Sequence, residues 1–343
     1  MRHLIVPGLA LLAVWAVSGV DSGLAQQRAD RNRARYAATK LSEVDEDFPF
    51  QGEYVGTVQT NEGEVEFGAQ IIALGGGQFH GVGYVGGLPG AGWDGSEKRE
   101  ADGRREGDRV IFEIPDGPRA EITKEGDDYV LRIYDAAGAE IGKLTKTVRK
   151  SPTLGKKPPK GAVVLFDGST AEKFINGRMT KDGLLMQGCM SKQKFGSAFV
   201  HIEFMTPYMP YARGQGRGNS GVYLQGRYEV QVLDSFGLEG AINECGAIYG
   251  VKPPDVNMCF PPLTWQTYDI EFHAPVFDEQ GKKVRNARMT VWHNGVLIHR
   301  DVEIPGPTRA ARFAESPEPG PLYLQDHGNP VRYRNIWIKP IED

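Results

Sequence analysis

The sequence contains little cysteine and no cysteine pair at metal-binding spacing. Three of the 343 residues are cysteines: Cys189, Cys245 and Cys259. Because no CxxC spacing occurs, the pattern is a poor match to a structural zinc site. In an oxidising compartment one pair is possible, and Cys245 and Cys259 are the better candidates because they bracket the Pro-rich loop GAIYGVKPPDVNMCFPP. Three unpaired thiols are the alternative.

A strong charge of either sign is also missing. The 40 Lys and Arg residues stand against 44 Asp and Glu residues, which gives a net charge of -4. Nothing in this balance indicates a nucleic-acid partner. Beyond the N-terminus no apolar run approaches the ~20 residues that a membrane span needs, so we expect no membrane span. The sequence does not indicate an oligomeric state.

The N-terminus has the pattern of a secretory signal. Arg2 and His3 precede an apolar run over residues 4–17, and small residues follow up to Ala25. This predicts a signal peptide over residues 1–25, cleaved after Ala25. The alternative is an uncleaved membrane anchor, but the run is short for a span of ~20 residues. Since the first cysteine is Cys189, a lipoprotein anchor is not expected, and the mature protein should be secreted or periplasmic.

Convincing helical periodicity is absent, and the abundant turn residues favour many short strands instead. The chain has 44 Gly and 22 Pro residues, and short apolar-alternating runs recur between them. The predicted fold class is all-β. We expect five segments: a signal peptide (1–25), a flexible or weakly helical lead-in (26–48), a small antiparallel β barrel or sandwich of unknown role (49–148), an extended and solvated Pro/Lys linker (149–160), and a jelly-roll β-sandwich (161–343).

One predicted strand divides its side chains unusually. In GNSGVYLQGRYEVQVLDSFG, alternation places Arg227, Glu229 and Gln231 on one side. Tyr228 and its apolar neighbours at positions 230 and 232 lie on the other side and can join a core. The polar side is either a solvated outer face or the floor of a polar cleft.

The motifs of the second half, taken in order, resemble a known family. They are VVLFDGST, GNSGVYLQGRYEVQVLDSFG, ECGAIYG, WQTYDIEFHAP, ARMTVWHNGVLIH and GPLYLQDHGNPVRYRNIWIKP. This order is similar to that of the 3-keto-disaccharide hydrolase family, secreted bacterial domains with a concanavalin-like fold, over about residues 161–341. One departure is the missing Trp after the LFDG-type segment, where Phe174 is a possible substitute. The resemblance implies a carbohydrate substrate oxidised at C3 of one sugar, cleaved by elimination and hydration or by hydrolysis.

The residues fit an ordinary two-carboxylate glycosidase poorly. Such enzymes carry a pair of carboxylates at a defined separation. Here Glu229 is followed on its face by Gln231 and Leu233, while Asp234 points to the other face unless a bulge re-aims it.

A 3-keto sugar needs different groups: one base near the C2 hydrogen, a cation or donor near the C3 oxygen, and a proton source for the leaving group. Glu229, His327 and Arg334 are the catalytic candidates. His327 could instead be a surface loop residue, and Arg334 a solvated strand residue that shares parity with two isoleucines. Arg227 is an equal rival as the cation.

The substrate-binding candidates are aromatic, amide and charged residues near these positions, because rings stack on sugars and amides bond hydroxyls. They are Asn219, Tyr223, Gln225, Arg227, Gln231, Asp234, Tyr249 and Gln325. The sequence contains no recognised motif for a cofactor or a metal, so no cofactor is predicted. A divalent cation is possible, with ligands from Glu229, Asp234, Glu244 and His327.

Two other functions compete with an enzyme. The same sandwich serves as a non-catalytic, lectin-like carbohydrate-binding module of the cell envelope, and the extra β domain would also suit a structural envelope protein. Glu229→Gln separates the first two, because a binding module should keep its ligand while an enzyme should lose turnover.

Overall fold

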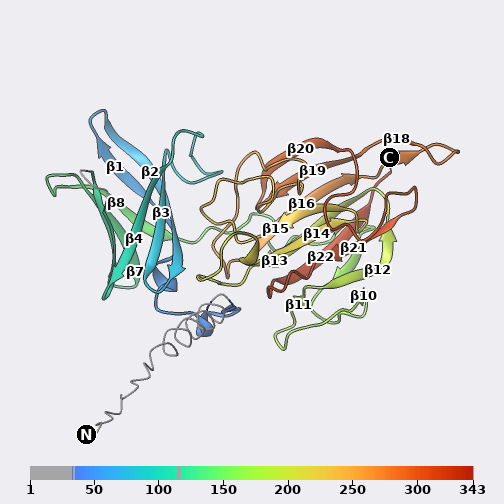
Figure 1. The fold of residues 1–343 in the computed structure, drawn as a ribbon, viewed down its shortest axis with the longest axis horizontal. Coiled ribbons are helices and arrows are strands. Elements are labelled where there is room, and N and C mark those ends of the chain that lie inside the picture. Colours follow the sequence, from blue (N-terminus) through green and yellow to red (C-terminus); the bar gives the residue numbers. More distant parts are fainter. Residues whose placement is uncertain (1–32, 34, 114–116, 343) are drawn as a thin grey trace, which may run out of the picture.

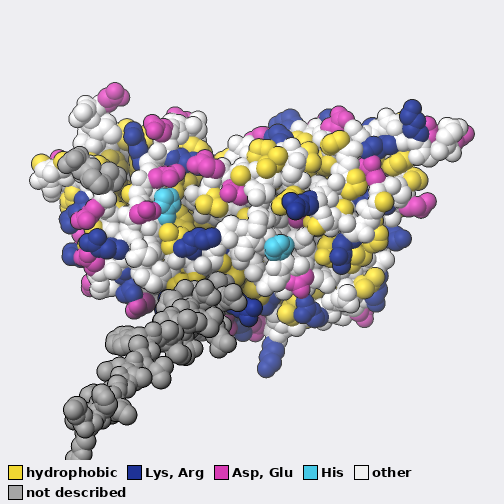
Figure 2. All heavy atoms as spheres, in the orientation of Figure 1, with side chains coloured by type: hydrophobic (Ala, Val, Ile, Leu, Met, Phe, Trp, Pro, Cys, Tyr) yellow, Lys and Arg dark blue, Asp and Glu magenta, His cyan; other side chains and the backbone are white. Residues whose placement is uncertain are grey.

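The computed structural model describes residues 33, 35–113 and 117–342, which form two β lobes joined side by side (Figure 1). The signal peptide predicted over residues 1–25 lies outside the described residues. Among the described residues, no helix has the length and apolar character needed to cross a membrane. Side chains of both charge signs are intermixed over the face shown in Figure 2.

The first lobe is a closed antiparallel barrel, which settles the choice between barrel and sandwich. Each strand pairs with the next, and the last returns to the first. Closure leaves no free sheet edge. The strands are β1 (Gly52–Thr60), β2 (Gly63–Gly75), β3 (Gln78–Val85), β4 (Arg99–Glu106), β5 (Arg109–Glu113), β6 (Arg119–Glu125), β7 (Asp128–Tyr134) and β8 (Glu140–Thr147).

The second lobe is the expected two-sheet sandwich. One sheet has the order β10 (Phe174–Ile175), β12 (Cys189–Phe195), β21 (Gly320–Leu324), β14 (Ser220–Leu224), β15 (Tyr228–Val232). The other has the order β11 (Leu185–Met186), β22 (Arg332–Pro340), β13 (Ala198–Met205), β16 (Gln266–His273), β19 (Ala287–His293), β20 (Val296–Ile304), with β9 (Val163–Phe166) on β22. A small hairpin adds β17 (Val276–Phe277) and β18 (Lys283–Arg285). The described residues also form short 3-10 helices, η1 (Leu41–Glu43), η2 (Phe48–Phe50) and η3 (Gly214–Gly216).

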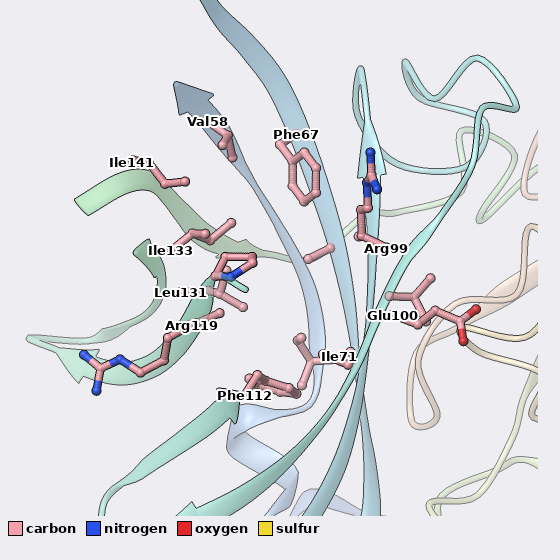
Figure 3. Close-up of a pocket in the computed structure, with 17 residues that line it drawn as sticks. Val58, Phe67, Ile71, Arg99, Glu100, Phe112, Arg119, Leu131, Ile133 and Ile141 are labelled. Atoms are coloured by element: carbon pink, nitrogen blue, oxygen red, sulfur yellow. The ribbon is translucent and has the colours of Figure 1, made fainter. Parts of the chain in front are cut away.

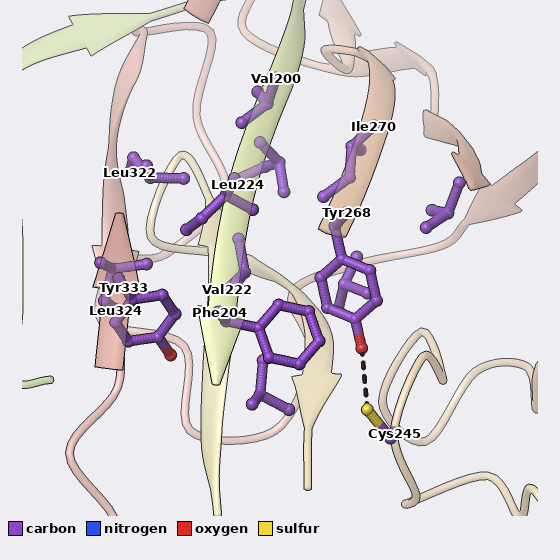
Figure 4. Close-up of a cluster of buried hydrophobic side chains, with 14 of the residues drawn as sticks. Val200, Phe204, Val222, Leu224, Cys245, Tyr268, Ile270, Leu322, Leu324 and Tyr333 are labelled. Carbon is purple, nitrogen blue, oxygen red and sulfur yellow. Dashed lines mark hydrogen bonds between the residues drawn. The ribbon is translucent and has the colours of Figure 1, made fainter. Parts of the chain in front are cut away.

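The sandwich core lies between the two sheets and receives the apolar side of each strand. Val222 and Leu224 of β14 pack with Val200 and Phe204 of β13 in one buried cluster (Figure 4). The apolar side predicted for β15, from Tyr228 to Val232, joins the same cluster. Alternation therefore turns the opposite side of β14 and β15 away from the core.

All three cysteines are buried thiols, so the structure holds no Cys245–Cys259 disulfide. Cys245 Sγ lies 3.2 Å from the Tyr268 hydroxyl, and Cys259 Sγ donates to the Leu233 carbonyl at 3.4 Å. The thiols fill the core beside the five-stranded sheet, as small apolar groups do.

The lead-in and the linker are both less free than expected. In the described part of the lead-in, Ala38 forms a β-bridge with Tyr208, whose hydroxyl donates to Asp45 Oδ1 at 2.8 Å. Residues from 36 onward are therefore docked rather than flexible.

The linker packs on the seven-stranded sheet instead of running through solvent. The Gly155 N–H donates to Glu203 Oε1 at 2.6 Å, and Lys156 Nζ lies 2.9 Å from Asp269 Oδ1. The Trp337 indole N–H donates to the Lys156 carbonyl at 3.1 Å. These buried polar groups of the sheet need partners, and the linker supplies them through its backbone and the Lys156 side chain.

Apolar packing and ion pairs join the two lobes, among them that of Lys98 of the barrel lobe with Glu239 of the sandwich at 2.9 Å. Ile72, Val82 and Tyr84 of the barrel belong to the same buried cluster as the sandwich core. Arg149, at the start of the linker, donates through Nε to the buried Glu53 of the barrel at 2.7 Å. Its guanidinium lies 4.9 Å from the centre of the Phe260 ring. Arg149 therefore contacts both lobes at once.

Replacing this arginine should weaken the joined structure. Arg149→Ala leaves the Glu53 carboxylate buried without its cation, so we expect the free energy of unfolding to fall by about 3 kcal/mol. Urea denaturation followed by tryptophan fluorescence would measure the change. Lys150→Ala, at the exposed neighbouring position, is the control and should stay within about 0.5 kcal/mol of the unmodified protein. An equal effect of both substitutions would contradict the assigned role of Arg149.

Candidate active site

A small polar cavity lies on the side of the five-stranded sheet that faces away from the core. Its volume is about 90 Å³. Tyr223 and Glu229 form part of its floor, because the core takes the alternate residues of the same strands. The lining residues are Gln215, Asn219, Tyr223, Glu229, Gln231, Tyr249, Arg309, Ala310, Gln325 and His327. The cavity thus brings together many of the side chains that the sequence indicated.

A tight hairpin turn sets the register of the cavity floor. The Arg227 N–H donates to the Leu224 carbonyl at 3.0 Å, while Gln225 and Gly226 take positive φ angles of 54° and 63°. Two consecutive positive φ values are typical of the turns that join twisted strands. The turn pairs Tyr223 directly with Glu229 across β14 and β15.

Gly221 provides the space into which the Glu229 carboxyl leans. Gly221 pairs with Gln231, two residues along from the Tyr223–Glu229 pair and therefore on the same face. A Cβ atom at Gly221 would overlap Glu229 Oε1 and lie 2.9 Å from Tyr223 Cε2. A glycine at this position therefore permits the close approach of the carboxyl to the strand backbone.

Burial changes the acid strength of Glu229. Only 2% of the residue is exposed. Loss of hydration raises the pKa of Glu229 to about 8, although the hydrogen bond from Tyr223 acts in the opposite direction. The carboxyl is therefore mostly protonated at neutral pH. A carboxyl whose pKa lies near the working pH can both take and return a proton.

The Tyr223 hydroxyl is placed to respond to the charge of Glu229. Its oxygen lies 2.7 Å from Glu229 Oε2 and 3.0 Å from the Arg309 carbonyl, and Gln325 Nε2 donates to it at 3.2 Å. The single hydroxyl proton can serve one acceptor at a time. When Glu229 is ionised, Tyr223 donates to it. When Glu229 is protonated, Glu229 can donate to Tyr223, which then turns its proton to the Arg309 carbonyl.

Two amide oxygens of the lining residues lack a partner. Asn219 Nδ2 donates to the Gln215 carbonyl at 2.8 Å, and Gln231 Nε2 donates to Gln215 Oε1 at 3.2 Å. These bonds orient both amides, yet Asn219 Oδ1 and Gln231 Oε1 are buried with no hydrogen-bond partner within the described structure. Buried acceptors normally have partners, so hydroxyl groups of a ligand would satisfy these two.

The rim of the cavity carries two exposed ionisable side chains. His327 follows β21, and Arg309 lies in the segment after β20. Sequence reasoning missed both Arg309 and Gln215. Arg309 is in a segment without strand alternation, and Gln215 is in the glycine-rich stretch RGQGRG, so neither has a periodicity that assigns it to a face.

Arg334 lies elsewhere, which corrects its assignment as a catalytic candidate. It belongs to β22 in the seven-stranded sheet, where its Nε donates to Glu203 Oε2 at 2.6 Å. Its guanidinium lies 4.0 Å from the Trp265 ring centre. The register of β13 and β22 shifts at this point, and Asn335 takes a positive φ of 43°. This irregularity re-aims Arg334 relative to its isoleucine neighbours.

Three substrate-binding candidates are also outside the cavity lining. Arg227 donates to Gln225 Oε1 at 2.9 Å and to Ser316 Oγ at 2.7 Å, so both residues hold the turn and a neighbouring loop. Asp234 forms a buried ion pair with Arg217 Nε at 2.7 Å. That pair supports η3 and the segment that joins it to β14, which together carry two of the lining residues, Gln215 and Asn219.

The residues named for a possible divalent cation do not form a cluster. In the described chain, no group of three or more His, Cys, Asp or Glu side chains is arranged to hold a metal ion. Glu244 accepts the backbone N–H groups of Gly240 and Ala241 at 2.7 and 2.9 Å. Asp234 is engaged by Arg217.

Amides, tyrosines and one buried carboxyl around a small cavity suit a polyhydroxylated ligand, which agrees with the family comparison. The model of the 3-keto-alpha-glucoside-1,2-lyase-like domain matches residues 161–339. The chain belongs to this family, and the match covers the whole sandwich strand set from β9 to β21 and nearly all of β22.

Two solved structures from Parabacteroides distasonis ATCC 8503, both described as candidate glycosyl hydrolases, are similar to about half of the chain. One shares 34% identity with a TM-score of 0.49, covering 53% of this chain and 85% of that chain. The other shares 18% identity with a TM-score of 0.39, covering 53% of this chain and 95% of that chain. No curated protein matches the chain.

The burial of Glu229 should make stability depend on pH in a defined direction. The raised pKa means that the folded state resists ionisation of Glu229, while in the unfolded chain the pKa of Glu229 is near its ordinary value of 4.5. The contribution favouring the folded state is present below pH 4.5 and is lost as pH rises to about 8. Glu229→Gln removes this dependence, so the variant should gain thermal stability relative to the unmodified protein at pH 8.5 but not at pH 5.

Differential scanning calorimetry at both pH values measures this effect. Glu279→Gln, at an exposed position, is the matched control and should show no such difference. If Glu229→Gln and the unmodified protein differed in melting temperature by the same amount at pH 5 and pH 8.5, the burial argument would be contradicted.

Proposed function

We propose that this protein cleaves 3-keto-glycosides at the glycosidic bond, with Glu229 removing the proton from C2. The observation that carries the proposal is the buried Glu229, whose pKa is raised to about 8 and which is the one carboxyl among the described residues that line the cavity. Membership of the 3-keto-alpha-glucoside-1,2-lyase-like family supports the substrate class. The signal pattern over residues 1–25 supports export to the periplasm or beyond.

The chemistry follows from the ketone. A carbonyl at C3 acidifies the hydrogen at C2, and ionised Glu229 takes that proton while the C–H electron pair forms an enolate. The enolate then collapses, the C1–O bond breaks, and the bonding pair leaves with the glycosidic oxygen. His327 at the rim is the candidate proton donor for that oxygen, and Arg309 replaces Arg334 as the candidate cation for the enolate. Water can add to the resulting enone in a later step.

Direct hydrolysis by paired carboxylates is less well supported. That reaction needs a second carboxyl about 5 Å or farther from the first, on the same cavity. Asp234, the nearest carboxylate in sequence, is paired with Arg217 outside the lining. A single carboxyl with a raised pKa suits proton abstraction beside a ketone better.

A non-catalytic carbohydrate-binding module is the second candidate function. The two unpartnered amide oxygens of Asn219 and Gln231 favour it, because they would bind sugar hydroxyls without any reaction. Binding alone, however, gives no reason to bury the Glu229 carboxyl beside Tyr223. Burial of the ionised carboxyl lowers the stability of the folded protein.

A turnover assay tests the proposal. The chain from Gln26 onward should cleave 3-keto-trehalose or a 3-keto-glucoside and leave the unoxidised sugars intact. Because Glu229 must be ionised to act as a base, kcat/KM should rise with pH and level off above about 8. Glu229→Gln should lower kcat by roughly 10²–10⁴-fold, while Glu279→Gln should be neutral. Deuterium at C2 should slow the reaction if proton abstraction limits the rate.

Cleavage of the unoxidised sugars, or full activity of Glu229→Gln, would overturn the proposal. Saturable binding of keto-sugars by both proteins without any cleavage would support the binding module instead.

A second test uses the space that Gly221 leaves for the carboxyl. Gly221→Ala should displace Glu229 and lower kcat on the keto-sugar by roughly 10²-fold, because a small misplacement of a catalytic group costs about this much. Gly196→Ala is the matched control, since a Cβ there meets no atom within 4 Å. Unchanged kcat in Gly221→Ala would show that the observed position of Glu229 is not required for turnover.

A further inference from the structure

The barrel contains a second cavity that is much larger than the one beside Glu229. Its volume is about 440 Å³, within the range of about 300–1,000 Å³ that is typical of small-molecule sites. The view in Figure 3 looks into this space, which is bounded by Phe67, Ile71, Phe112, Leu131 and Ile133. Nothing in the proposed reaction uses it.

Small residues in the barrel wall create this space. The small lining residues come from β2, β3, β4 and β6. They are Ala69, Gly81, Gly83, Ala101 and Ala120. An eight-stranded barrel is just wide enough for large side chains to fill it, or to hold one small ligand when they do not. The small residues that line this end of the barrel leave space for a ligand rather than filling the interior.

The opposite end of the barrel is filled. Phe50, at the end of η2, packs its ring 5.1 Å from that of Tyr129 and 6.2 Å from that of Phe79. Tyr54 is fully buried beside them and donates its hydroxyl to the Phe50 carbonyl at 2.7 Å. The cavity therefore has an aromatic base and a single candidate mouth.

Strand register places two arginines at the mouth. Arg99 begins β4 opposite Gly83 of β3, and Arg119 begins β6 opposite Tyr134, the last residue of β7. Since neighbouring strands are antiparallel, the starts of β4 and β6 lie at the same end of the barrel. This end is the one opposite Phe50.

The charges at this mouth favour an anion. Within the described chain, no carboxylate lies at ion-pair distance from Arg99, so its charge is available to a ligand. Arg119 points away from the space in Figure 3, lies over the Tyr134 ring and is 3.6 Å from Glu121, so it does not contribute. Glu100 is the one acidic residue among the lining residues. Its side chain points away from the space in Figure 3 and lies 3.5 Å from the His80 ring.

We propose that the barrel binds an amphipathic anion, with a hydrocarbon chain in the apolar cavity and a carboxylate near Arg99. A fatty-acid-like carboxylate is the ligand class that matches an apolar, one-ended cavity with a cationic mouth. The site is separate from the cavity around Glu229, and its occupancy does not depend on the proposed cleavage reaction.

A fluorescent fatty acid provides the probe, titrated into the full chain from Gln26 onward. We expect saturable one-to-one binding. Ala101→Phe fills the cavity and should weaken binding by at least roughly tenfold, or about 1.4 kcal/mol. Ala314→Phe, at an exposed position of the sandwich lobe, is the matched control and should bind as the unmodified protein does. Circular dichroism and thermal melting check that each variant folds.

A second variant tests the charge at the mouth even if Ala101→Phe misfolds. Arg99→Gln should weaken the fatty acid by several-fold but leave a neutral long-chain alcohol, measured by competition, unaffected. No saturable binding of the fatty acid to the unmodified protein would overturn the proposal. Equal binding by a folded Ala101→Phe, or an equal effect of Arg99→Gln on acid and alcohol, would also contradict it.

Discussion

The register of the β14–β15 hairpin is the constraint on which the site depends. Each strand has one side in the sandwich core and the other in the cavity, so a slip of one residue would exchange the two sides. Such a slip would place Glu229 in the apolar core and Val230 in the cavity. The turn at Gln225 and Gly226 fixes the register locally, and the buried apolar residues of both strands fix it from within. The position of the carboxyl is thus a consequence of core packing.

The barrel helps to position the lining of the cavity around Glu229, because it supplies a hydrogen-bond partner to a buried arginine of the sandwich. Arg217 is paired with Asp234 and also donates through Nη1 to the Ala73 carbonyl of β2 at 3.4 Å. The segment formed by η3 and the residues that follow it is therefore held between the two lobes, and it carries Gln215 and Asn219 to the cavity. Arg217, which lies within the family match, is in this way positioned by the barrel, which lies outside it.

Strand alternation predicted the parts of the site that depend on side-chain parity alone. Tyr223, Glu229, Gln231 and Gln325 lie in or directly after regular strands, and the structure brings them to one cavity. Arg334 was misplaced because alternation assigns a face but not a sheet, and because the β13–β22 register shift changes the direction of its side chain.

The remaining differences come from contacts that span large sequence separations. Arg309 reaches the cavity from a loop without periodicity, so no local pattern marks it. The linker looked solvated because it is rich in Pro and Lys. Its partners, Glu203 and Asp269, are on strands far along the chain and become visible only once the sheets are assembled. The barrel or sandwich alternative was open for the same reason, because closure depends on the pairing of β1 with β8.

The apolar contact between the lobes has a consequence for how this protein can be divided. Ile72, Val82 and Tyr84 point outward from the barrel and are covered by the sandwich. A barrel expressed by itself would present these side chains to water as a hydrophobic patch, and a sandwich by itself would lose the support of its η3 segment. The two lobes are therefore not interchangeable modules joined by a tether. They form one architectural unit whose boundary in sequence does not coincide with a boundary in packing.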